Sequence, residues 1–97
     1  MTRLIFLFTL LISAAACSRT PLDGGELATS KGCVACHGNN GTATAPSYPS
    51  LDGQWERYLR LQLMAYRSGK RENGIMNGMA AALTDEEIRA LAEHYGR

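Results

Sequence analysis

Mostly apolar side chains recur at helical spacing between residues 54 and 68. One face of this stretch carries Trp55, Tyr58, Leu59, Gln62, Leu63 and Tyr66. Arginines occupy the opposite side at Arg57, Arg60 and Arg67, and Gly69 follows where a left-handed cap would end a helix. The pattern predicts an amphipathic helix over 54–68 whose basic side faces solvent.

Two further stretches carry helix start signals. In "TDEEIRALAEHY", residues 84–95, Thr84 and Glu87 stand in capping-box positions before apolar residues at helical spacing. Residues 23–32 read as a short helix with Asp23 as N-cap and Gly32 near its end. Residues 38–50 and 70–82 are rich in Gly, Asn and Ala without an apolar period, which favours irregular structure. No segment alternates with period two, so the predicted class is all-α.

The first 17 residues, "MTRLIFLFTLLISAAAC", are typical of an export signal. Arg3 precedes an apolar run of about nine residues, Leu4 to Ile12, and small residues follow it. The run is well short of the roughly 20 residues that span a bilayer as a helix. Cys17 resembles the lipid-accepting cysteine of bacterial lipoproteins, although Ala14 stands where such signals usually have leucine. Simple cleavage after the alanines, leaving Cys17 as a stray thiol, is the alternative.

We therefore expect a signal peptide over 1–16, Cys17 as a lipidated mature N-terminus, a linker over 17–22 and one domain over 23–97. The mature protein is expected in the periplasm, held at the membrane by lipid. A net charge of +1 without a long basic run gives no indication of nucleic-acid binding. A domain of about 80 residues buries a modest core and usually needs a disulfide, a metal or a cofactor. Two cysteines beyond Cys17 exclude a disulfide scaffold.

The candidate chemistry lies in "CVACH", residues 33–37. Cys33 and Cys36 with His37 allow three interpretations: a thiol redox pair, a zinc site or covalent haem attachment. A redox pair expects a preceding strand, and zinc needs two more ligands, for which only Cys17 and His94 remain. Haem uses all three residues, because two thiols on one turn can bond two vinyl groups while the next residue offers its imidazole to the iron. The pattern C-x-x-C-H is the signature of this attachment, so we predict one haem c.

The sixth iron ligand is less defined by the sequence. Met64 falls on the outer side of its helix, and His94 lies in a last helical turn where it favours the helix dipole. Met76 and Met79 lie in the segment "NGIMNGMAAA", which we expect to be a loop that can bring a thioether to the metal. Either could instead be a flexible apolar gap-filler. Spacing alone does not separate the two.

The order of "GGELATSKGCVACHG", "APSYPSLDGQ" and "YRSGKRENGIMNGMAAALTDEEIRALAEHY" resembles class I c-type cytochromes. The likeness, from about residue 23 to 97, is to one half of the dihaem periplasmic cytochromes or their small single-haem relatives. It implies a small cytochrome c fold with three to four helices around one haem. It also implies that Gly25 lies where the first and last helices cross. His94 stands there in place of the family's aromatic residue.

The same resemblance assigns the cofactor site. Cys33 and Cys36 would bond the haem, and His37 would be the proximal ligand. The family's distal methionine lies seven positions before the leucine that precedes the last helix, which gives Met76 and leaves Met79 as the alternative. Pro49 would accept the ring N–H of the proximal histidine through its carbonyl, and Leu51 would pack on the haem.

Ligation by histidine and methionine fills both axial positions of a haem iron, which suits single-electron transfer. We therefore expect an electron carrier without catalytic residues, serving a respiratory or oxidative chain. Its partners would be dehydrogenases, cytochrome complexes or terminal oxidases; its oligomeric state stays open. The alternatives are a haem subunit of an oxidoreductase complex, such as a flavin-containing sulfide dehydrogenase, and a haem protein with an open distal site.

Overall fold

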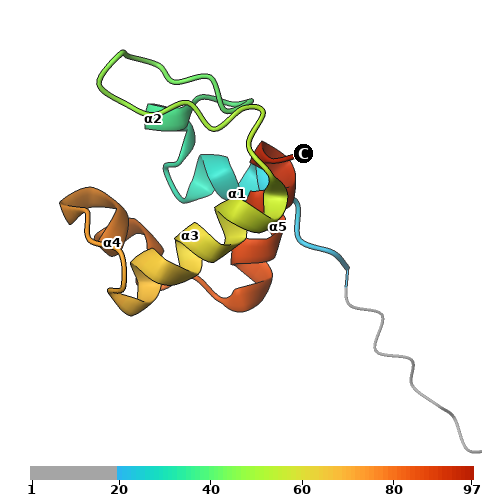
Figure 1. Cartoon of the computed structure of the whole chain (residues 1–97). Coiled ribbons are helices and arrows are strands. Elements are labelled where there is room, and N and C mark those ends of the chain that lie inside the picture. The colour runs from blue at the N-terminus through green and yellow to red at the C-terminus, as the bar shows by residue number, and fades with distance from the viewer. Residues whose placement is uncertain (1–19) are drawn as a thin grey trace, which may run out of the picture.

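Figure 1 shows the computed structural model of the chain, which describes residues 20–97. This part contains no strand and folds into five helices: α1 (Gly24–Ser30), α2 (Val34–His37), α3 (Glu56–Ser68), α4 (Gly74–Ala80) and α5 (Asp85–Tyr95). The all-α class is confirmed, with more helices than the three or four expected. The predicted signal peptide and Cys17 lie outside the described residues.

Two of the predicted helices, α1 and α5, begin at the side-chain caps expected from the sequence. The Asp23 carboxylate accepts a hydrogen bond from the Glu26 N–H at 3.0 Å, which starts α1. At the start of α5, the Thr84 hydroxyl oxygen accepts from the Glu87 N–H at 3.1 Å. The Thr84 N–H donates in return to the Glu87 carboxylate at 3.0 Å. These bonds satisfy backbone N–H groups that have no partner within the helix.

The segment 70–82 differs from its prediction, because residues Gly74–Ala80 form helix α4 instead of an irregular loop. Asn73 caps this helix. Its side-chain oxygen accepts from the N–H groups of Ile75 at 3.1 Å and Met76 at 3.0 Å. Two of the first-turn donors are therefore satisfied, which favours a helix despite two glycines and no sustained apolar period.

Helix α5 packs against both α1 and α3, and α4 packs against α3 (Figure 1). The buried side chains where these helices meet are Ala28, Leu59, Ala80, Leu83, Ile88, Leu91, Ala92 and Tyr95. Ile88 is the only large side chain among the described residues that is fully buried. The apolar core is therefore small, as expected for a domain of this length.

Gly25 lies at the crossing of α1 and α5 beside His94, as expected, but the tighter contact is made by Gly24. A Cβ on Gly24 would overlap the Ala90 carbonyl oxygen and lie 2.7 Å from the Cβ of His94. A Cβ on Gly25 would meet only side-chain atoms, at 3.2 Å or more. The His94 ring packs edge-on against Tyr95 with 4.7 Å between centroids, and its Nε2 lies 2.6 Å from the Asn39 carbonyl oxygen.

The arginine side of α3 is not wholly a solvated face. Arg67 donates to the Leu83 carbonyl at 3.0 Å and pairs with Asp85 at 2.7 Å, so it connects α3 to the start of α5. Nearby, Lys31 pairs with Glu87 at 3.3 Å. Ion pairs thus connect Arg67 and Lys31 to acidic residues at the start of α5. Within the described residues, no helix is long and apolar enough to cross a membrane.

Candidate cofactor site

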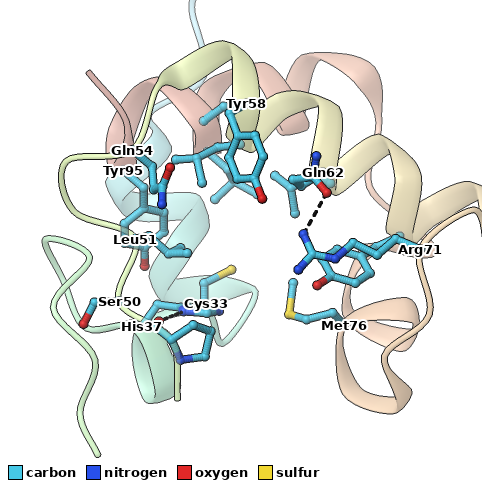
Figure 2. A pocket seen from close by; sticks show the side chains of 16 residues that line it. Cys33, His37, Ser50, Leu51, Gln54, Tyr58, Gln62, Arg71, Met76 and Tyr95 are labelled. Atoms are coloured by element: carbon cyan, nitrogen blue, oxygen red, sulfur yellow. Dashed lines mark hydrogen bonds between the residues drawn. The ribbon is translucent and has the colours of Figure 1, made fainter. Parts of the chain in front are cut away.

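A pocket with a mainly apolar lining lies between the α1–α2 turn and helices α3, α4 and α5 (Figure 2). It encloses about 870 Å³ of empty space, part of it open to solvent. Its cavity volume, without the space open to solvent, is about 200 Å³. Leu51 and Leu63 are half-buried side chains of its wall. Besides its small core, the fold therefore has a second apolar surface, which lines this pocket.

His37 is the one buried polar residue of the described chain, with 8% of its surface exposed. Its Nδ1 lies 2.8 Å from the Pro49 carbonyl oxygen. A carbonyl can only accept, so Nδ1 must carry the proton. In the neutral ring, Nε2 therefore keeps its lone pair. The bond also restricts rotation of the ring, which leaves a pre-oriented nitrogen ligand at the pocket.

Met76 lines the same pocket, and Figure 2 shows it on the side opposite His37. Met79, one helical turn later in α4, does not line the pocket and is 39% exposed. Its methyl group lies instead beside Gly32, 3.7 Å from where a Cβ of that glycine would be. Met64 is 40% exposed on the outer side of α3. Of these three methionines, only Met76 faces His37.

The two cysteines stand on a single turn of chain. The N–H of His37 donates to the Cys33 carbonyl at 2.9 Å, which closes the turn that contains α2. Cys33 lines the pocket, as Figure 2 shows, whereas Cys36 is half-buried outside its lining. Both thiols are free. Burial raises the pKa of the Cys33 thiol, which disfavours its thiolate at neutral pH.

Several residues of the pocket were not predicted as site residues. The apolar stripe of α3 was predicted as a helix face, but it also lines the pocket with Tyr58, Leu59, Gln62, Leu63 and Tyr66. Arg71 joins them: it donates to the Gln62 side-chain oxygen at 2.7 Å, and its guanidinium lies 4.8 Å from the Tyr66 ring centroid. The stripe itself was the available signal, whereas nothing in the sequence indicated Arg71.

Tyr95 was likewise predicted only as an apolar position of its helix. It lines the pocket, and its hydroxyl donates to the Gly38 carbonyl at 2.8 Å, one residue beyond His37. The two rings meet edge-on at 6.4 Å between centroids. Burial raises the pKa of Tyr95 to about 12, so the hydroxyl stays a donor across the physiological range.

The set of donor atoms fits haem better than the two alternatives. A nitrogen ligand and a thioether face each other across apolar walls, and free thiols stand beside the nitrogen ligand. Soft and imidazole ligands of this kind suit iron in a porphyrin. Among residues 20–97 there is no cluster of three or more His, Cys, Asp or Glu that could hold a zinc ion. No strand precedes Cys33 in that range either, which a thioredoxin-like pair would need.

Comparison with known proteins agrees with this chemistry. The family model described as cytochrome c matches residues 22–94. Cytochrome c-554(548) of Halomonas halodenitrificans is 47% identical over 66 residues, which cover 65% of this chain and 80% of that protein. The thiosulfate dehydrogenase electron acceptor of Stutzerimonas stutzeri is 44% identical over 66 residues, 65% of this chain and 31% of that protein.

A third relative is the cytochrome subunit of sulfide dehydrogenase from Chlorobaculum tepidum. It is 33% identical over 72 residues, covering 74% of this chain and 64% of that protein. The chain thus spans most of the Halomonas cytochrome but only about a third of the thiosulfate dehydrogenase electron acceptor.

Proposed function

The chain belongs to the cytochrome c family, and from that premise we propose that it carries single electrons on one covalently bound haem c. Cys33 and Cys36 would hold the haem by thioether bonds, and His37 and Met76 would bind its iron. When bound, the haem supplies an iron that changes oxidation state by one electron. The observation that carries the proposal is the placement of His37 and Met76 on opposite sides of one apolar pocket.

The protein's own groups prepare these ligands. The Pro49 carbonyl fixes the tautomer and orientation of His37, and such partners of a ligand also raise its basicity. Leu51 and Leu63 would give the haem an apolar wall to pack against. With His37 and Met76 both bound to the iron, no coordination position would remain for oxygen or a substrate. This favours electron transfer over catalysis.

Met76 is preferred to Met79 as the sixth ligand for a structural reason as well as the resemblance. Both belong to α4, but only Met76 lines the pocket, while Met79 lies beside Gly32. Moving Met79 to the iron would require α4 to turn about its axis and release the cap at Asn73.

A second candidate function is that of a haem subunit in a larger oxidoreductase. Similarity to the cytochrome subunit of a sulfide dehydrogenase favours it. The two functions share the same site and differ in whether the chain works alone. Purification under mild conditions separates them: a free carrier elutes at the size of the single chain, whereas a subunit elutes with a flavoprotein whose flavin absorbs in the same fraction.

We also propose that residues 1–16 direct export to the periplasm, that Cys17 becomes a lipidated N-terminus and that residues 17–22 link it to the domain. An anchor would keep the carrier near membrane-bound redox partners. The wild type should then sediment with membranes and show a lipid mass increase, and a processed Cys17→Ser variant should do neither. Soluble wild-type protein without the added mass would contradict the anchor.

The proposed function is tested by redox titration and by carbon monoxide. We expect one reversible one-electron transition and haem that stays bound after acid denaturation. Carbon monoxide should leave the reduced wild-type spectrum unchanged, because a thioether already occupies the sixth position. Met76→Ala, which opens that position, serves as the positive control and should bind the gas. Equal binding by wild type and control would favour an open-site haem protein, and absence of haem would favour a thiol redox domain.

A further inference from the structure

The Asn77 side chain uses all of its hydrogen-bonding groups to join parts of the chain that are separate in sequence. Its amide nitrogen donates to the Tyr66 carbonyl at 2.9 Å and to the Arg71 carbonyl at 2.8 Å. Its amide oxygen accepts from the Asn73 N–H at 2.7 Å. The side chain is half-buried; its bond to the Tyr66 carbonyl is partly buried, and the other two bonds are exposed.

Asn77 directly follows Met76 in α4. This helix has seven residues, a length at which helices are marginal in water without tertiary contacts. The Asn77 amide ties it to the carboxyl end of α3, since Tyr66 lies in the last turn of that helix. The Arg71 carbonyl belongs to the connection between the two helices. One side chain therefore fixes the distance between α4 and the helix that forms the pocket wall.

We propose that Asn77 is a positioning residue that holds the Met76 thioether at the iron; this rests on Met76 being the axial ligand proposed above. Asn77 does not touch the pocket. It acts by holding α4 against α3, because a departure of α4 would break the partly buried bond to the Tyr66 carbonyl and the bond to the Arg71 carbonyl.

Two aspartate variants separate this role from a general effect of charge. In Asn77→Asp the side chain keeps its shape but loses both donors, and its carboxylate faces two carbonyl oxygens. In Asn73→Asp the same chemical change occurs four residues earlier in the chain. There the side chain acts only as an acceptor from Ile75 and Met76, which a carboxylate does equally well.

The readout is the rate at which added imidazole displaces the thioether from the oxidised, haem-loaded protein. We expect Asn77→Asp to accelerate displacement at least about tenfold, since it loses the partly buried bond to the Tyr66 carbonyl and turns a carboxylate toward two carbonyl oxygens. Asn73→Asp should stay within about twofold of wild type. Equal rates for the two variants would overturn the proposal. The proposal would also be overturned if the loss of global stability, measured by guanidinium unfolding, fully accounted for the faster displacement.

The failure of this proposal and that of the proposed function are distinguishable. If the oxidised wild type lacks a sulfur-to-iron charge-transfer band, methionine ligation itself is wrong. If the band is present and the variants do not differ, only the role of Asn77 is wrong. Asn77→Ser, which keeps a single donor hydrogen, is measured in parallel. If Asn77→Asp fails to load haem, Asn77→Ser takes its place, and its displacement rate should exceed that of wild type. A rate equal to wild type would again overturn the proposal.

Discussion

Replacing Gly24 by alanine is expected to destabilise the crossing of α1 and α5 far more than the same change at Gly25. A methyl group on Gly24 would overlap the Ala90 carbonyl oxygen and lie 2.7 Å from the His94 Cβ. These atoms are backbone, or attached directly to it, and cannot move without shifting a helix. A methyl group on Gly25 would meet only side-chain atoms: Oδ1 of Asp23, which caps α1, at 3.2 Å and the His94 ring at 3.4 Å.

The magnitudes follow from two opposing effects. Overpacking of a well-packed contact typically costs about 1–3 kcal/mol, and a clash with backbone belongs at the upper end. Against this, alanine is favoured over glycine within a helix by up to about 1 kcal/mol. The net expectation is a loss of about 2–3 kcal/mol for Gly24→Ala. For Gly25→Ala the expected change lies between a gain of about 1 kcal/mol and a loss of about 1 kcal/mol, because the methyl group would press on the Asp23 oxygen that caps α1.

Thermal unfolding of the haem-loaded variants, followed by far-ultraviolet circular dichroism, measures the difference. For a domain of this size about 1 kcal/mol shifts the midpoint by roughly 4–8 °C, so Gly24→Ala should melt about 10–20 °C below wild type. Gly25→Ala should melt within roughly 4–8 °C of wild type in either direction. Equal midpoints for the two variants, or a larger loss at Gly25, would refute this geometry of the helix crossing.

Two further predictions concern charged groups around α5. Arg67→Met should lower the free energy of unfolding by about 1–2 kcal/mol in denaturant titrations, because it removes a charged hydrogen bond and a partly exposed ion pair. The control Arg60→Met should change this free energy little, since Arg60 has no described partner. Glu87 has a lowered pKa because it accepts the Thr84 N–H, so its contribution is complete above the ordinary value of 4.5 and is lost as the pH falls through the lowered value. Glu87→Gln keeps the acceptor but does not titrate. The unfolding midpoint of wild type should therefore fall more steeply as the pH is lowered than that of the variant. Parallel plots of midpoint against pH would contradict this role of Glu87.

The features that sequence reasoning predicted are those fixed by near neighbours in the chain. Asp23 and the pair Thr84 and Glu87 bond to backbone groups three residues away, so the starts of α1 and α5 could be read from residue spacing. The motif of residues 33–37 occupies a single turn for the same reason. Helix α3 followed from its amphipathic stripe, although the stripe did not reveal that it lines a pocket.

The features that were missed depend on contacts between distant residues. Helix α4 was predicted as a loop because its glycines and missing period outweighed the cap, and Asn77 could not be known to bond the end of α3. Arg67 was predicted in solvent because its partner lies 18 positions later in the numbering, at Asp85. The tighter contact at Gly24 was missed because the exact register of α1 on α5 is set by packing.

The central claim is that Met76 and His37 are the two axial ligands of one covalently bound haem. The most direct test is the sulfur-to-iron charge-transfer band of the oxidised protein in wild type, Met76→Ala and Met79→Ala. The band should be present in wild type and Met79→Ala and absent in Met76→Ala, whose reduction potential should also fall sharply because thioether sulfur favours reduced iron. Loss of the band in Met79→Ala with its retention in Met76→Ala would contradict the claim.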